Sequence, residues 1–293
     1  MIAAIESEGA PRDLGLDQGR ACRASLREAL ANSGPTQRWL LPLGASEARL
    51  ERDLKRHFPH LAESLAGLAA GAGVPARRLV RRLADELARG PRGARAVASG
   101  LGAGAWLAVD CAGSWIARRS RPEGGFTGVE LVRPWLVAAF AGVNEAGLAV
   151  VALPASGAAG PCSAPAALLA QDCLQRFGRV ESALDWCSGR PAGHGAALLF
   201  SDARGELAGV EIRAAARRVL RSDAALLAWA DDPNAGAELA KALRQAAPAT
   251  AAALAQALAP ERPPGCVTVI VDPAARRLGL LPAAGAEPDW LAL

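Results

Sequence analysis

The sequence predicts an α+β protein in which helices enclose two blocks of mostly antiparallel strands. Three observations support this fold class. The first ninety residues have helical periodicity, short apolar runs separated by Gly, Pro and charged residues dominate 94–153 and 195–230, and helical segments return between and after these runs. Helices before, between and after two strand blocks indicate sheets that are covered by helical layers on their outer faces.

Residues 1–90 are predicted to be largely helical. A first helix opens after Pro11, and its buried stripe is expected to comprise Leu14, Gln18, Cys22, Leu26 and Leu30. A second long helical segment should break at Pro59, because proline removes a backbone donor, and should end at Gly73. A third helix is expected to begin at Pro75.

The remainder of the chain, 91–293, is predicted to be strand-rich and to form one domain with the helical region, so that a single domain spans 1–293. No internal repeat or compositional break argues for a second domain. The expected strands are 2–6, 94–100, 104–120, 134–143, 147–153, 195–202, 205–213, 217–221 and 224–230, followed by a hairpin over 266–282. The expected helices of this region are 164–177, 180–187, 234–246 and 249–258.

Composition excludes several classes of function. The net charge of +4 is spread out, and no basic stripe with stacking aromatics indicates a nucleic-acid partner. The six Cys residues and three His residues show no metal-ligand spacing, so we expect neither a metal nor another cofactor. No signal peptide and no apolar run of membrane-spanning length is evident, which predicts a cytoplasmic protein without a membrane partner.

The stretch FAGVNEAGLAVV, residues 140–151, predicts a hairpin with a tight polar turn at Asn144, Glu145 and Gly147. A second hairpin is expected over 201–211, with Asp202 at its turn. Asp202 and Glu211 can be interpreted as an acid/base pair, or as a turn residue and a strand-end residue with structural roles.

Four segments, in this order, resemble one known family. They are GAPRDLGLDQGRACRASL, FPHLAESLAGLAAGAGVPARRLV, RPEGGFTGVELVRPWLVAAFAGVNEAGLAVV and GAALLFSDARGELAGVE, and together they lie within residues 9–213. They are similar to the opening glycine-containing helix, a long helix that ends in a Gly-x-Gly-Val turn, and two hairpins of the penicillin (isopenicillin N) acyltransferase-like family of N-terminal-nucleophile (Ntn) hydrolases. The resemblance implies a four-layer αββα sandwich with a largely helical N-terminal region.

The resemblance also implies a particular chemistry. Such proteins cleave themselves before an internal Cys, and the new α-amine then serves as the base for that thiol in amide hydrolysis or acyl transfer. The motif required is Gly-Cys-Thr or Gly-Cys-Ser at the start of the first strand after the helical region. Here Gly93, Ala94 and Arg95 occupy these positions, so Ala94 stands where the nucleophile is expected. The family's companion Asn, five residues before the hairpin Asp, falls on Ala197, with His194 close by.

A second alignment places the nucleophile at Cys111 and the cleavage point between Asp110 and Cys111. It retains a thiol, with Asp110 or Asp202 to orient it and His194 as a proton carrier. It leaves few residues between Cys111 and the 140–151 hairpin for the strands that the family places there. The first alignment is therefore favoured.

The sequence thus predicts a homologue of the cysteine amide hydrolases and acyltransferases that does not process itself and is catalytically impaired. It is expected to keep a ligand cleft near Asn144 and Glu145 for a small amide or acyl partner. The alternative is an active, self-cleaving amide hydrolase or acyltransferase that uses Cys111. A third interpretation is a stabilising partner subunit of an active paralogue, and the sequence does not define the oligomeric state.

Overall fold

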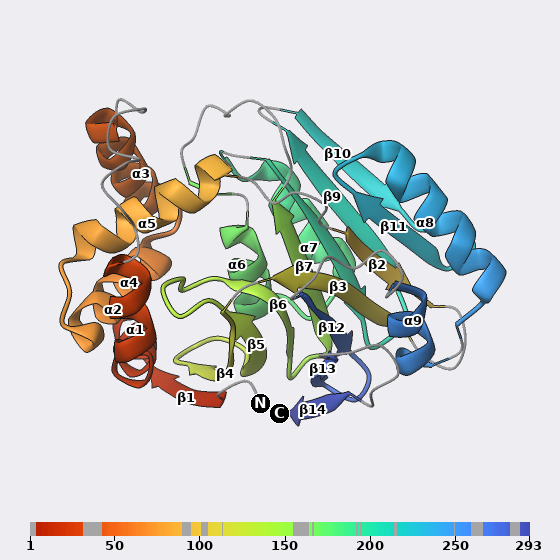
Figure 1. Cartoon of the computed structure of the whole chain (residues 1–293), viewed down its shortest axis with the longest axis horizontal. Coiled ribbons are helices and arrows are strands. Elements are labelled where there is room, and N and C mark those ends of the chain that lie inside the picture. Colours follow the sequence, from red (N-terminus) through yellow and green to blue (C-terminus); the bar gives the residue numbers. More distant parts are fainter. Residues whose placement is uncertain are drawn as a thin grey trace.

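The fold is a four-layer αββα sandwich (Figure 1). The computed structural model describes residues 4–31, 43–89, 95–100, 105–112, 114–154, 164–165, 167–191, 193, 195–213, 216–248, 250–258, 266–281 and 288–293. Within these ranges the strands form two sheets that pack face to face, with helices on both outer faces. The predicted fold class is confirmed.

The larger sheet has eight strands in the described part of the chain. Their spatial order is β1 (Ala4–Gly9), β4 (Ile116–Pro122), β5 (Gly128–Val132), β6 (Ala139–Asn144), β7 (Leu148–Pro154), β8 (Ala196–Asp202), β9 (Leu207–Arg213) and β10 (Ala216–Arg221). All neighbours in this sheet are antiparallel except β1 and β4, which are parallel with Ala4 opposite Ala117. The N-terminal strand is therefore an edge strand held by a segment from the middle of the chain.

The smaller sheet has six strands among the described residues. Their order is β11 (Leu226–Ala230), β2 (Arg95–Ser99), β3 (Trp106–Ala112), β12 (Cys266–Asp272), β13 (Arg277–Leu281) and β14 (Asp289–Ala292). Arg119 of β4 donates to the carbonyl of Ala292 and binds Glu6 of β1, so that the two ends of the chain lie beside each other in Figure 1.

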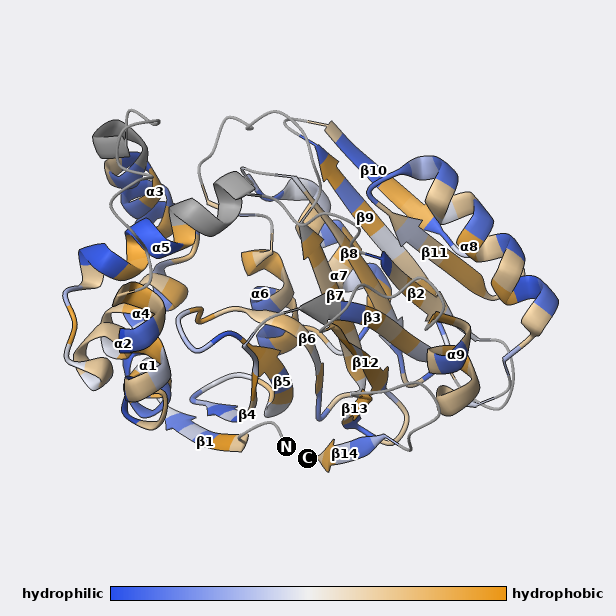
Figure 2. Ribbon diagram, viewed as in Figure 1, coloured by the Kyte–Doolittle hydropathy of each residue, from blue (hydrophilic) through white to orange (hydrophobic). Residues whose placement is uncertain are grey.

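Two groups of helices cover the outer faces of the sheets. In the first group, α6 (Leu168–Arg176) and α7 (Val180–Gly189) pack on the eight-stranded sheet and α1 (Pro11–Ala21) contacts its strands β1 and β4. The helices α2 (Arg23–Ala31), α3 (Leu43–His57), α4 (Pro59–Ala72) and α5 (Ala76–Arg89) pack with α1 as a helical bundle beside the sheet (Figure 1). The second group packs on the six-stranded sheet and comprises α8 (Pro233–Ala246) and α9 (Ala251–Leu258). Apolar residues dominate the strands between these layers, whereas polar residues recur along α5 and α8 (Figure 2). No helix in the described ranges is long and apolar enough to cross a membrane.

Helices α1 and α4 touch through glycines. A Cβ added at Gly15 would lie 1.8 Å from the carbonyl oxygen of Ser64, and one added at Gly67 would lie 1.9 Å from that of Arg12. Gly19 and Gly71 are similarly enclosed by the backbone of the opposite helix. The two backbones are therefore in direct contact, which only glycine permits at these positions.

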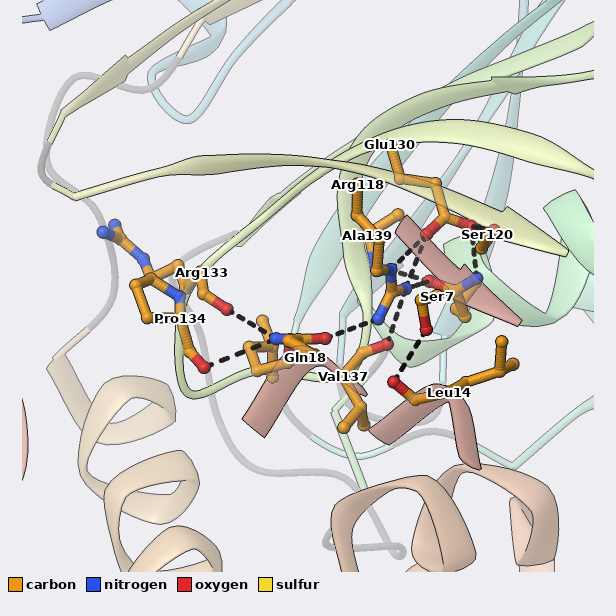
Figure 3. A network of polar contacts seen from close by, with 12 residues as sticks. Ser7, Leu14, Gln18, Arg118, Ser120, Glu130, Arg133, Pro134, Val137 and Ala139 are labelled. Atoms are coloured by element: carbon orange, nitrogen blue, oxygen red, sulfur yellow. Dashed lines mark hydrogen bonds and ion pairs between the residues drawn. The ribbon is translucent and has the colours of Figure 1, made fainter. Parts of the chain in front are cut away.

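A buried polar network joins α1 and α6 to the eight-stranded sheet (Figure 3). Arg118 of β4 donates to Glu130 of β5 and to the side-chain oxygens of Gln18 in α1 and Gln171 in α6, at 2.8, 2.6 and 3.0 Å. Gln18 in turn donates to the carbonyls of three residues in the segment between β5 and β6, namely Arg133, Pro134 and Leu136. The network therefore fixes an irregular segment as well as two helices.

Most predicted elements are confirmed, with three differences. The break at Pro59 is present, but the first predicted helix divides at Cys22 into α1 and α2. The run 104–120 is not one strand, because β3 and β4 lie in different sheets. The run 134–143 begins with turns, and only its second half is β6.

Candidate functional site

The first strand after the helical region is β2, and an ion pair stands at its beginning. Arg95 donates from Nη2 to Asp110 Oδ2 at 2.9 Å and to the carbonyl of Leu258 at 2.8 Å. Thr268 Oγ1 donates to the other oxygen of Asp110 at 2.6 Å. The neighbours Ala96 and Val109 belong to the core between the sheets, so Arg95 and Asp110 face α9 instead. Asp110 is thus a buried member of an ion pair that ties β2, β3 and β12 together.

The two candidate nucleophile positions flank this ion pair in the sequence. Ala94 precedes Arg95 and lies outside the described residues. Cys111 follows Asp110 in β3, a strand that begins at Trp106, and its backbone pairs with Val267 of β12. Cys111 therefore lies near the C-terminal end of its strand, whereas position 94 directly precedes a strand.

A buried carboxylate lies at the same end of the sandwich. Trp229 of β11 pairs with Ala96 and donates from its indole N–H to Glu211 Oε1 at 3.1 Å. Arg213 and Arg218 each donate from Nε to Glu211 at 3.0 Å. Burial raises the pKa of Glu211, but the bonds from Trp229, Arg213 and Arg218 outweigh burial and lower that pKa below its usual value. Glu211 is therefore held as a carboxylate where β2 begins, and we call this end of the sandwich the β2 end.

Position 197 also lies at the β2 end. Ala197 of β8 pairs with Glu211 of β9. The position at which the resemblance expects an Asn is therefore adjacent to the buried carboxylate of Glu211.

An aromatic and arginine stack occupies the β2 end as well. Trp115 follows the last residue of β3 by three positions, so the chain places it within about 11 Å of that strand. Its ring centroid lies 4.7 Å from that of Phe140, and the guanidinium of Arg133 lies 4.0 Å from the Trp115 ring. Arg133 and Arg82 of α5 also lie over Trp135, at 5.6 and 4.6 Å. The stack therefore links α5 to the irregular segment between β5 and β6, whose carbonyls accept hydrogen bonds from Gln18.

The β6–β7 hairpin lies at the opposite end of the sandwich. Arg276, in the turn between β12 and β13, donates to the carbonyl of Glu145 at 2.6 Å. That turn lies at the end of β3 where Leu107 pairs with β12. Cys111, near the other end of β3, is four residues or about 13 Å from Leu107. Asn144 uses both amide hydrogens on the carbonyls of the α6 C-terminus and accepts from Leu148. The expected ligand cleft at Asn144 and Glu145 therefore gains no support, because these residues hold a turn.

Asp202 also has a structural role at that opposite end. Its Oδ2 accepts from the backbone N–H of Val180 at 3.3 Å and from Arg179 Nε at 2.9 Å, so it caps the N-terminus of α7. Its Oδ1 accepts from the N–H of Arg204 within its own hairpin. Asp202 and Glu211 stand at opposite ends of the β8–β9 pair, so the structure does not bring them together as an acid/base pair.

Sequence reasoning named Asp110 only for the Cys111 alternative and Glu211 only as a possible partner of Asp202, and it did not predict the roles of Arg95, Trp229 or the aromatic stack. The sequence shows Glu211 as a carboxylate at the end of a strand. Its hydrogen-bond partners come from β10 and β11, and no local sequence pattern predicts that these strands bring donors to it. His194 lies outside the described residues. Within the described part of the chain, no group of three or more His, Cys, Asp or Glu side chains is arranged to hold a metal ion.

The layer order and the position of β2 after the helical region define the class: an Ntn-hydrolase fold. The structure is similar to a Caenorhabditis elegans N-acylethanolamine-hydrolyzing acid amidase ortholog, with a TM-score of 0.51 and 11% identity over 62% of this chain and 93% of that chain. It is also similar to penicillin V acylase from Agrobacterium tumefaciens (TM-score 0.44, 16% identity, 68% and 86% covered). A third similar structure is a mutant of conjugated bile acid hydrolase from Clostridium perfringens (0.45, 11%, 68% and 92%).

At this level of identity the likeness concerns the fold. No family model matches the sequence, and no curated protein sequence matches it significantly.

Proposed function

We propose that the chain is an Ntn-type amide hydrolase homologue that does not process itself and binds an amide or acyl ligand at the β2 end. One observation carries the proposal. The strand β2 begins at Arg95, directly after the helical region, and the residue before it in the sequence is Ala94. A methyl group cannot attack a carbonyl, so neither self-cleavage nor acyl-enzyme formation can start from this position.

The position of Cys111 supports the same proposal. A nucleophile of this class must become the first residue of a strand, so that its free α-amine can accept the thiol proton. Cys111 is the sixth residue of β3, and the strand continues to Ala112. A cut before Cys111 would divide a strand that β12 pairs on both sides of the cut, at Asp110 and at Cys111.

The alternative function is an active hydrolase that uses Cys111. The observation in its favour is the position of the thiol in the sequence, since Cys111 directly follows Asp110, where the second alignment places the cleavage point. In that case the purified protein would consist of fragments 1–110 and 111–293.

Intact mass spectrometry separates the two functions. We expect a single species of 30.0 kDa for the non-processing homologue. Fragments divided between Asp110 and Cys111 would refute it, and the Cys111→Ala variant is the matched control because a methyl group cannot attack, so it abolishes cleavage in the alternative and changes nothing in the favoured function. The same samples serve for activity assays with an N-acylethanolamine, penicillin V and a conjugated bile acid, where we expect binding without turnover. Turnover that Cys111→Ala abolishes would establish the alternative.

The Ala94→Cys variant tests the assigned nucleophile position. The introduced thiol is expected to react with iodoacetamide faster than Cys111 in the same molecule, because it would precede β2 at the end where ligands are proposed to bind. An introduced thiol that reacts more slowly than Cys111 would move the site away from residue 94.

A further inference from the structure

Two buried thiols face each other between α6 and α7. The Sγ atoms of Cys173 in α6 and Cys187 in α7 lie 3.6 Å apart, and both residues are fully buried in the core against the eight-stranded sheet. A disulfide requires about 2.05 Å between sulfurs, so an approach of about 1.5 Å would allow a bond.

The residues that precede the thiols in each helix are also bonded to each other. Asp172 accepts a hydrogen bond from the indole N–H of Trp186 at 2.7 Å. Asp172 is fully buried, and it is held further by Arg176 Nε at 2.8 Å and by His60 Nε2 of α4 at 3.1 Å. The Asp172–Trp186 bond therefore fixes the relative position of α6 and α7, so that the two sulfurs stay opposite each other.

We propose that Cys173 and Cys187 are a site of reversible oxidation at which a hydroperoxide converts the thiol pair into a disulfide that joins α6 to α7. One thiolate attacks the peroxide, the O–O bond breaks, and a sulfenic acid forms with release of hydroxide. The second thiol displaces water from the sulfenic sulfur and forms the S–S bond. In sum, two thiols and one hydrogen peroxide give one disulfide and two waters, with two electrons passing from sulfur to oxygen.

Burial of the two thiols determines how fast they are oxidised. Burial, together with the neighbouring Cys187, raises the pKa of the Cys173 thiol well above its usual value, so little thiolate is present at neutral pH. Cys187 lies two residues before the end of α7 at Gly189, where the last turn of a helix opens most readily. Oxidation is therefore slow at low peroxide and passes through an opening of the α7 C-terminus.

The disulfide would also affect β6 and the segment that leads to it, because α6 is hydrogen-bonded to them. Gln171, in the same helix turn as Cys173, accepts from the N–H of Ala139 at 2.9 Å and donates to Glu130 at 2.6 Å. Through these bonds α6 holds the start of β6 and the segment that leads to it from Arg133. A covalent link from α6 to α7 closes a short loop and restricts the unfolded chain, which stabilises the helical layer over this segment.

The test uses the full-length wild-type protein, with hydrogen peroxide as the probe. The reduced protein is treated under native conditions, remaining thiols are alkylated in denaturant, and tryptic peptides are analysed without reduction. We expect a cross-linked species with two hydrogens fewer, which dithiothreitol reverses, and a melting temperature several degrees higher in the oxidised form. Fragmentation must distinguish Cys173 from Cys162, because both lie within tryptic peptide 120–176.

Two matched variants complete the test. Cys22→Ser removes another buried thiol and is expected to leave the cross-link unchanged, whereas Cys187→Ser is expected to abolish it. The proposal is overturned if wild-type Cys173 and Cys187 are both alkylated after peroxide treatment, if Cys173 pairs with Cys162, or if the cross-link forms only in denaturant. None of these outcomes depends on the folding of a variant.

Discussion

The buried Arg118 gives the sharpest test of how the fold is held together. Arg118 is 3% exposed and binds the Glu130 carboxylate, which is 1% exposed, together with Gln18, Gln171 and the carbonyl of Val137. The substitution Arg118→Met keeps most of the apolar volume of the side chain and removes the guanidinium. It therefore leaves the Glu130 carboxylate without its countercharge.

The magnitude follows from what remains around Glu130. Two neutral donors still reach Glu130 Oε1, namely Ser120 Oγ at 2.9 Å and Gln171 Nε2 at 2.6 Å, and they offset part of the loss. Removing one partner of a buried ion pair costs about 3–5 kcal/mol. For a chain of this size such a loss lowers the melting temperature by roughly 6–20 °C.

Urea unfolding followed by circular dichroism measures the change. Glu130→Gln in the Arg118→Met background is expected to restore more than half of the loss, because it removes the stranded charge. Arg119→Met is the control on the same strand, since Arg119 is partly exposed, pairs with the exposed Glu6 and should change the free energy of unfolding by no more than about 1 kcal/mol. A loss below about 1 kcal/mol for Arg118→Met, or a double variant less stable than the single one, would refute the reasoning.

Three further predictions follow from the helices. Gly15→Ala should lower the free energy of unfolding by about 3 kcal/mol, because the added methyl would meet the Ser64 carbonyl, whereas Gly189→Ala, where an added Cβ meets nothing within 4 Å, should stay within about 0.5 kcal/mol in the same urea titration. Asp202→Ala should cost about 2 kcal/mol by uncapping α7, and unchanged hydrogen exchange in the first turn of α7 would contradict this role. Burial raises the pKa of Asp172, but bonds and charges from His60, Arg176 and Trp186 outweigh burial and lower it, so its stabilising contribution is complete above the unfolded pKa of about 3.9 and is lost as pH falls through the lower folded value. Between pH 7 and pH 3, the free energy of unfolding should therefore fall less steeply at the acid end for Asp172→Asn than for the wild type. Parallel curves for the two proteins would contradict this role of Asp172.

Local signals in the sequence were sufficient for most elements of the fold. Proline at 59 ends one helix and begins the next, and Gly73 adopts a left-handed conformation (φ +66°) at the end of α4. The division of 104–120 between two sheets was not predictable from local signals. Both halves have the apolar content of buried strands, and the choice of sheet depends on partners at 95–99, 128–132 and 266–272.

The candidate site was less predictable than the fold, for a physical reason. Residue type and motif order located Asp110, but Glu211 acquires its partners only when β10 and β11 fold back on β9 and β2. Asn144 and Asp202 have the residue types of catalytic polar groups. Their actual roles follow from the end of the sandwich at which their turns lie, and that is a long-range property of the sheets.

The parallel pairing of β1 with β4 has a consequence for the order in which the chain assembles. Ala4 leaves the ribosome more than a hundred residues before its partner Ala117. At roughly 5–20 residues per second, the N-terminal strand waits on the order of 5–20 seconds for the edge on which it docks. The glycine contact between α1 and α4 joins segments much closer in the sequence, so it can form during that interval and keep β1 near the growing chain. The strand β1 thus stays unpaired until β4 has been synthesised, and β5 to β10 extend the sheet from β4 afterwards.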